Sequence, residues 1–226
     1  MACFAHSQLV VNDGLAALTS STVLSKCSAL ATLVHHHTSL FKSSFEEVFG
    51  SGHSVPVANS TRWNSLLHQL EAAAGFDSDK MTTLLQQTDH SNLILSSREL
   101  SMLLELIDIL QPFAEATDKT QGNSARIICV LPTVVALHKC LSGMSVKFHT
   151  TLVRQLLSSL ERRFKGLLAT MKMLPPHVSN TSECYASLIF PISTVLDPQF
   201  GFQWLDLHHP GSDAVKNEVR RSITGI

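Results

Sequence analysis

Residues 96–119, SSRELSMLLELIDILQPFAEATDK, decide the fold class. Their apolar residues recur at i, i+3, i+4 and i+7, the spacing of an amphipathic helix. The stripe consists of Leu100, Leu103, Leu104, Ile107, Leu110, Ala114 and Thr117. Ser96 followed by Glu99 is a capping box, in which a hydroxyl and a carboxylate satisfy N–H groups at the start of the helix. Pro112 lies inside the pattern and predicts a kink or a break near Gln111.

Helical periodicity continues on both sides of this segment. Residues 150–173 carry a second long stripe, and a continuous helix of about 22 residues there would span roughly 33 Å before Pro175 and Pro176 stop it. That stripe consists of Val153, Leu156, Leu157, Leu160, Phe164, Leu167, Leu168 and Met171. Residues 124–141 are rich in β-branched side chains, but their length favours a buried helix over a strand. Residues 21–49 and 61–74 are also predicted to be helical, and Ser60 or Thr61 is the expected N-cap of the latter.

The connections between these helices are short. Residues 51–59 form the clearest loop, and residues 75–80 and 175–183 are further connectors. Residues 185–205 and 213–223 predict short helices around Pro191, Pro198 and Pro210. Because no Val/Ile-rich runs bounded by turn residues alternate with the helices, we expect an all-α protein. We expect one domain, 1–226, with N-terminal helices in 1–50, the loop 51–59 and a helical bundle in 60–226.

The composition indicates a globular chain without a strong net electrostatic field. The 226 residues are 44% hydrophobic and 15% charged, with a formal net charge of −1. Such a balance attracts neither phosphate backbones nor anionic lipid over the whole surface, so nucleic acid would need a local basic patch. The five cysteines are odd in number and widely spaced, which favours reduced thiols in the cytosol or nucleus. We expect no signal peptide and no membrane span.

Three kinds of reactive site can be tested against the sequence. Zinc needs four Cys or His ligands, and Cys3 with His6 supplies one pair that nothing completes. A Cys3 nucleophile would need an orienting carboxylate, and a small apolar core residue beside a hydrogen-bonded His6 is the simpler interpretation. Two-metal chemistry needs convergent carboxylates, and no such triad is found. We therefore expect no catalytic residue, no metal site, no cofactor and no small-molecule substrate.

Three stretches, in this order, resemble the hAT-type transposases and their domesticated descendants, the zinc finger BED domain-containing proteins. CFAHSQLVVNDGL, residues 3–15, is similar to that family's Cys-x-x-His motif and the Leu-rich helix after it. STRWNSLLHQLE, residues 60–71, is similar to the Arg-Trp motif that opens a helix. STVLDPQFGF, residues 193–202, is similar to the Leu-Asp-Pro-Arg-Phe-Lys box, with Gln199 and Gly201 in place of the family's Arg and Lys.

The resemblance implies a fold and a set of residues. In that family a ribonuclease H-like core is interrupted by a large helical insertion, and this chain corresponds to the insertion without the BED finger. The catalytic Asp residues would precede Met1 and the Glu would follow Ile226, so no residue here inherits an acid role. The positions that match family motifs are Cys3, His6, Arg62, Trp63, Asp197 and Pro198. Trp63 and Arg62 are the candidates for nucleic-acid contact, with packing of Trp63 beside Leu66 and Leu67 as the alternative.

The resulting hypothesis is a non-enzymatic, transposase-derived nuclear protein that acts as an interaction module in transcriptional regulation. The cytoplasm is the alternative location. Protein partners are expected, self-association included, while direct DNA binding would be weak, because Glu161–Lys165 and Arg220–Arg221 are the compact basic clusters and are typical of solvated helix faces. The alternatives are a remnant nucleic-acid-binding or metal-dependent nuclease activity, and a relic with little molecular function.

Overall fold

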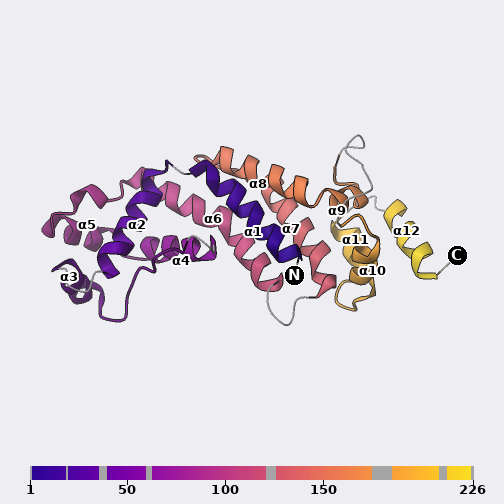
Figure 1. Ribbon diagram of the computed structural model, residues 1–226, viewed down its shortest axis with the longest axis horizontal. Coiled ribbons are helices and arrows are strands. Elements are labelled where there is room, and N and C mark those ends of the chain that lie inside the picture. The colour runs from indigo at the N-terminus through magenta and orange to yellow at the C-terminus, as the bar shows by residue number, and fades with distance from the viewer. Residues whose placement is uncertain are drawn as a thin grey trace. The chain divides into compact units, whose positions relative to one another are not determined.

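The computed structural model describes residues 2–18, 20–35, 40–59, 63–120, 126–174, 185–208 and 213–224, with only the backbone described for 2–5, 207 and 208. Every regular element in these ranges is helical (Figure 1), which confirms the predicted all-α class. The chain divides into two compact units, each built from segments distant in sequence. The first unit comprises Met1–Asp13, Pro112–Ser145 and Val153–Ile226, and the second comprises Gly14–Gln111 and Val146–Leu152.

The second unit is built on helix α2. Helix α2 packs against α3, α4 and the 3₁₀ turn η2, and α3 packs in turn against α5. The bounds are Thr22–His35 for α2, Leu40–Phe49 for α3, Trp63–Ala74 for α4, Ser78–Gln87 for α5 and Ser91–Leu93 for η2, with a further turn η1 at Ala16–Leu18. Helix α6, Ser97–Thr120, contributes its residues up to Gln111 to this unit.

Four phenylalanine rings cluster in the second unit, and two of them, Phe41 and Phe45, are buried. The ring centroid of Phe45 lies 5.1 Å from that of Phe49 and 5.2 Å from that of Phe76, and Phe49 and Phe76 are 4.8 Å apart. Phe41 lies 6.1 Å from Phe45 and 5.6 Å from the ring of His90. Edge-to-face and offset contacts of this kind are each worth about 0.5–1.5 kcal/mol beyond burial itself. They hold α3 against Phe76 and His90, which flank α5 in the chain.

The predicted capping box is present at the start of α6. The Ser96 N–H donates to Glu99 Oε2 at 2.9 Å, and the Glu99 N–H donates to Ser96 Oγ at 3.3 Å. Lys26 of α2 donates from Nζ to the same carboxylate at 2.8 Å and to the Ile94 carbonyl at 2.8 Å. The hydrogen bond from Lys26, helped by the Ser96 backbone, lowers the pKa of Glu99. One carboxylate therefore caps α6 and joins it to α2.

A second carboxylate of α6 holds the loop before α8. Glu105 accepts hydrogen bonds from the backbone N–H groups of Lys147, Phe148 and His149 at 2.6, 2.8 and 2.8 Å. His149 also makes a side-chain hydrogen bond of 2.9 Å to the Met102 carbonyl oxygen. Burial raises the pKa of Glu105, but the three N–H donors outweigh it and the net pKa is lowered.

The first unit contains the remaining helices, except for the last two residues of α1 and the first three of α8, which belong to the second unit. Helix α10 is the hub of the first unit, because it packs against α7, α11, α12 and the turn η3. The bounds are Ala2–Leu15 for α1, Ile127–Cys129 for η3, Val130–Gly143 for α7, Thr150–Arg163 for α8, Lys165–Thr170 for α9, Ile189–Leu196 for α10, Gly201–His208 for α11 and Asp213–Thr224 for α12. The helices predicted within 124–141, 185–205 and 213–223 are thus confirmed.

The buried face of α6 differs from the predicted stripe. Leu103, Leu110 and Thr117 are buried as expected, but Leu104 is 48% exposed. The buried residues are Leu103, Leu106, Ile109, Leu110, Phe113, Ala116, Thr117 and Thr120. The prediction was wrong at Leu104 and missed Leu106, because Leu104, Leu106 and Ile107 offer two overlapping apolar faces and only the neighbouring helices select one.

The continuous helix predicted for 150–173 is wrong as well. Helix α8 ends at Arg163 and α9 begins at Lys165, with Phe164 at φ −113° and ψ 25° between them. Phe164 is completely buried, and its ring lies 5.1 Å from Tyr185. Burial of this ring, together with the low helix propensity of Gly166, outweighs the regular backbone geometry. The predicted stop at Pro175 and Pro176 lies outside the described residues.

Two predicted boundaries also change. Helix α6 is not broken at Pro112, although the division between the two units falls between Gln111 and Pro112. The connector predicted at 75–80 is shorter, because Asp77 is an N-cap whose side chain accepts the Lys80 N–H at 2.9 Å and α5 begins at Ser78.

Residues 51–59, predicted to be a loop, contain no helix or strand. The N-cap predicted at Ser60 or Thr61 lies outside the described part of the chain.

None of the described helices is by itself both long enough and apolar enough to cross a membrane; only residues 6–18 and 22–35, a pair of helical segments with a sharp bend between them, have that length and composition when taken together.

The contacts of Glu105 predict a stability change with a defined pH dependence. Replacing Glu105→Gln keeps the size of the side chain but removes the charge that accepts three N–H groups, so the free energy of unfolding should fall by about 1–3 kcal/mol near neutral pH. Because the folded pKa lies below the ordinary value of 4.5, this contribution is complete above that value and is lost as the pH falls through the folded pKa.

Urea titrations of both proteins between pH 7 and pH 3 measure this effect. The difference in stability between the two proteins should shrink towards the acidic end. Glu47→Gln, at an exposed position on α3, is the matched control and should change stability by less than about 0.5 kcal/mol. An equal loss at every pH would contradict the assignment of the effect to the Glu105 charge.

Candidate functional site

His6, of the Cys-x-x-His pair, lies in an aromatic cluster of the first unit. Its Nδ1 is 2.9 Å from the Tyr185 hydroxyl oxygen, and its ring meets Phe164 and Tyr185 edge-on, with centroids 5.9 and 5.5 Å away. Tyr185 in turn lies 5.4 Å from Phe190 of α10. The side chain of Cys3 lies outside the described residues. His6 therefore joins α1 to the segment that enters α10.

Trp63, of the Arg-Trp motif, is the first residue of α4 and is 4% exposed. A side chain covered to this extent offers no face on which an unpaired base could stack, so its burial favours packing in the core over nucleic-acid contact. Its Nε1 has no hydrogen-bond partner among the described residues. Arg62, the other candidate for nucleic-acid contact, lies outside them.

The Leu-Asp-Pro box forms the turn between α10 and α11. Asp197 Oδ1 accepts the Gln199 N–H at 2.8 Å, and the Asp197 carbonyl accepts the N–H groups of Phe200 and Gly201 at 3.1 and 3.0 Å. Gly201 has a φ of +55°, which a residue without Cβ adopts most easily. Pro198 is exposed. Asp197 is also the C-cap of α10, where its backbone N–H donates to the Thr194 carbonyl oxygen, so it has a structural role in this turn.

The three motifs are distributed over the two compact units. His6 and Asp197 belong to the first unit and Trp63 to the second. None of the described hydrogen bonds or ring contacts joins any two of these residues.

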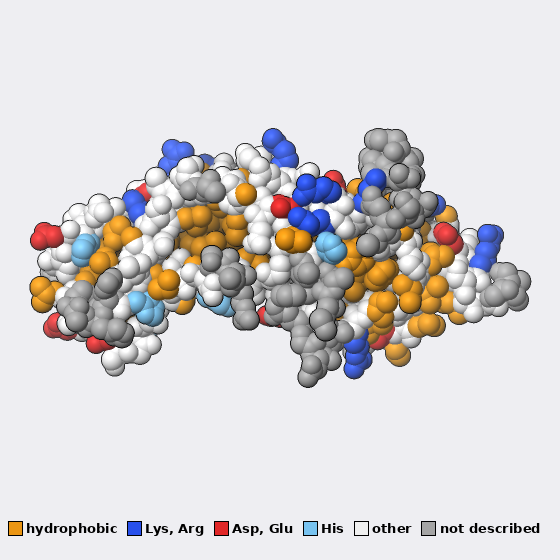
Figure 2. Space-filling view, in the orientation of Figure 1, with side chains coloured by type: hydrophobic (Ala, Val, Ile, Leu, Met, Phe, Trp, Pro, Cys, Tyr) orange, Lys and Arg blue, Asp and Glu red, His pale blue; other side chains and the backbone are white. Residues whose placement is uncertain are grey.

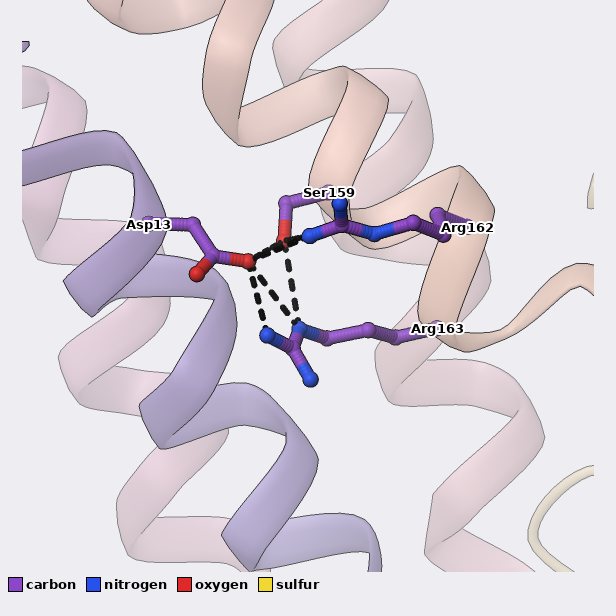
Figure 3. Close-up of polar contacts among 4 residues, drawn as sticks. All are labelled: Asp13, Ser159, Arg162 and Arg163. Atoms are coloured by element: carbon purple, nitrogen blue, oxygen red, sulfur yellow. Dashed lines mark hydrogen bonds and ion pairs between the residues drawn. The ribbon is translucent and has the colours of Figure 1, made fainter.

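A polar cluster that the sequence did not reveal joins α1 to α8 (Figure 3). Asp13 Oδ2 accepts hydrogen bonds from Ser159 Oγ at 2.5 Å, from Arg162 Nη2 at 2.7 Å and from Arg163 Nη2 at 2.8 Å. The hydrogen bond from Ser159 and the pairing with Arg163 and Arg162 outweigh burial, and the pKa of Asp13 is lowered. About 150 residues separate the partners, so no local pattern could have indicated the contact.

The basic cluster Glu161–Lys165 is consequently not a plain solvated face. Glu161 Oε1 is 3.0 Å from His138 Nε2 of α7, the Arg163 side chain is only 20% exposed, and Phe164 is fully buried. Arg162 is 68% exposed but shares Asp13 with Arg163. Two of the cluster's positive charges therefore face a carboxylate of the same chain, which reduces the field available for phosphate.

An open groove of about 490 Å³ lies in the first unit between α6, α7 and α11. Its floor is buried, its walls are partly exposed, and Glu115, Lys119 and Ala136 stand exposed at its rim. The lining residues are Pro112, Glu115, Ala116, Lys119, Cys129, Pro132, Thr133, Ala136, Leu137, Cys140, Phe200 and Trp204. A concave, mainly apolar site of this volume is the type that proteins use for binding.

The cysteines near the groove are thiols. Burial, and to a lesser extent the charge of Glu115, raises the pKa of Cys140. Burial raises the pKa of Cys27, in the second unit, to about 11. Nucleophilic cysteines need the opposite shift, because the thiolate is the reactive form. The arrangement around Cys140 suits packing.

The same unit also exposes apolar side chains outside the groove. On α10, Ile189 and Leu196 are 52% and 63% exposed, and Ile127 of the adjacent turn η3 is 41% exposed. Figure 2 shows that hydrophobic side chains gather over α10 and α11 on the face in view. Within the described ranges, no three His, Cys, Asp or Glu side chains come close enough to form a metal site.

Comparison with known proteins adds no relative. No family model, no curated protein and no solved structure matches the chain.

The Asp13 cluster gives a second prediction. Asp13→Asn removes the charge shared by two guanidinium groups, and the free energy of unfolding should fall by about 0.5–2 kcal/mol, a range that allows for solvent screening of a partly exposed group. Since the pKa of Asp13 is lowered, its contribution is complete above the ordinary value of 3.8 and disappears as the pH falls through the folded value.

Thermal and urea unfolding at pH 7 and at pH 3 measure the difference. Asp118→Asn, at an exposed position on α6, is the control and should leave stability within about 0.5 kcal/mol. A loss for Asp13→Asn that did not shrink at low pH would show that the ion pairs are not its source.

Proposed function

We propose that this protein is a non-enzymatic, transposase-derived interaction module that acts in the nucleus, in the control of transcription. The observation that carries the proposal is the apolar groove between α6, α7 and α11. Exposed apolar surface of this kind marks binding sites in folded proteins. The three motif stretches support the transposase origin, and the nuclear location and link to transcription follow from that resemblance.

The use of the carboxylates supports a binding role over a chemical one. Glu99 caps α6 and pairs with Lys26, Glu105 holds three backbone N–H groups, and Asp13 binds two arginines and a serine. In each of them the pKa is lowered, which keeps the group ionised and engaged. These three carboxylates therefore stabilise the fold by capping, ion pairing and accepting backbone N–H groups.

The charge distribution supports protein partners over DNA. The chain has a formal net charge of −1, and Arg162 and Arg163 are paired with Asp13. Each phosphate contact contributes a slope of about −0.9 to the plot of log affinity against log salt on duplex DNA. A protein with its main basic cluster engaged internally would make few such contacts.

A tethering assay tests the function directly. The chain is fused to a sequence-specific DNA-binding domain and expressed with a reporter gene that carries the cognate sites. Recruitment of a partner should change reporter output several-fold relative to the DNA-binding domain alone, at equal nuclear abundance. Unchanged output would overturn a role in transcription.

Purified protein distinguishes the alternatives. A steep salt dependence of duplex DNA binding would replace the protein-interaction proposal with a DNA-binding one. Cleavage of DNA in the presence of Mn²⁺ or Mg²⁺, abolished by one Asp→Ala change, would replace the protein-interaction proposal with a nuclease activity. We expect neither, and we expect cooperative unfolding above about 45 °C, as in ordinary mesophilic domains.

A further inference from the structure

The groove is bounded by two matching helical stripes. On α6 the lining residues are Pro112, Glu115, Ala116 and Lys119, at i, i+3, i+4 and i+7. On α7 the residues Thr133, Ala136, Leu137 and Cys140 repeat the same spacing. Residues spaced in this way lie on one face of a helix. Two such faces, each about 10 Å or two turns long, therefore look onto the same empty space.

The lining suits the close approach of a third helix. Ala116 and Thr133 are small and buried, and Ala136 is small and exposed at the rim. Helices pack with their axes about 8–10 Å apart, and small residues at the contact permit the shorter distances. Phe200, just before α11, and Trp204 of α11 form a further wall, and Trp204 is 8% exposed. Apolar side chains of an incoming helix would fit between this wall and the two stripes.

The charges at the rim indicate the chemistry of that helix. Glu115 and Lys119 are exposed, one turn apart on α6, and neither has an ion-pair partner in the described part of the chain. A helix lying along α6 would place side chains four residues apart opposite these two groups. One basic and one acidic side chain at that spacing would complement both.

We propose that this groove binds an amphipathic helix of a partner protein, two to three turns long, with apolar anchors at i, i+3, i+4 and i+7. One flank of the helix carries a basic and an acidic residue four positions apart, which face Glu115 and Lys119. The inference rests on the proposed function and names the kind of partner. Recognition of this type draws on burial of the anchors for affinity and on the flanking charges for specificity.

Synthetic helical peptides of about 14 residues, roughly four turns, serve as the probes. All carry leucine at the four anchor positions, and three versions place Glu and Lys, two Lys, or two Glu at the flanking positions. The Glu–Lys peptide should bind tightest, by about two- to five-fold, which is the range for exposed ion pairs. The order of the pair is immaterial, because the helix can dock in either direction.

Binding is followed by the tryptophan indole N–H signals in a ¹H–¹⁵N NMR titration. The chain has two tryptophans, so Trp204 reports on the groove while Trp63, in the second unit, serves as the internal control. The chemical shift of the Trp204 indole N–H should change as peptide is added, and that of Trp63 should remain constant.

Two variants test the site and one tests the charges. Ala136→Phe fills the groove from an exposed position and should weaken binding at least about ten-fold, while Ser142→Phe, exposed on the same helix outside the groove, should leave it unchanged. Glu115→Lys should transfer the preference to the peptide with two Glu residues.

Several results would overturn the inference. One is a Trp204 indole signal that does not shift with any of the peptides at about 1 mM. Another is a peptide affinity for Ala136→Phe equal to that for the wild-type protein. Peptide affinities independent of flanking charge in both wild type and Glu115→Lys would remove the stated partner chemistry. A dimer in sedimentation that Ala136→Phe disrupts would assign the groove to a second copy of this chain. Each of these results leaves the reporter assay of the proposed function intact, so the two proposals fail separately.

Discussion

Burial of one stripe on α6 is the constraint on which the rest of the structure depends. Leu103, Leu106, Ile109, Leu110 and Phe113 are all at most 1% exposed. Each contributes about 1.5–3 kcal/mol when taken out of water. A proline inside a helix costs about 3 kcal/mol, because it lacks an N–H and crowds the preceding turn. The apolar residues on either side of Pro112 outweigh that cost, and α6 therefore remains one helix while contributing to both units.

The polar contacts then position the neighbouring segments against the helices. Glu99 ties α6 to α2, Glu105 holds the loop before α8, and Asp13 ties α1 to α8. Each carboxylate accepts two or more hydrogen bonds, so these links define orientation as well as distance. The same contacts remove charge from the surface. The first unit also exposes apolar side chains that are available for recognition, in the groove and on α10.

The groove itself follows from how α6, α7 and α11 share one core. Their inner faces are buried together, but Pro112, Ala136 and Phe200 reach the wall or the rim, where the described part of the chain provides no further covering helix. A vacant position of this kind retains the packing preferences of a helix bundle. The feature that favours a protein partner is therefore a consequence of the fold, and it requires no catalytic group.

Local patterns in the sequence determined the helical class, the capping box of Ser96 and Glu99, and the short helices around the prolines, because these depend on residues within a turn or two of each other. They could not determine which face of α6 is buried, where Phe164 interrupts α8, or that Asp13 meets Arg162 and Arg163. Nor could they distinguish the stripe at Thr133, Ala136, Leu137 and Cys140 from an ordinary core face. The choice in each case belongs to the tertiary structure, because burial and ion pairing depend on segments that are far apart in the chain and meet only when it folds.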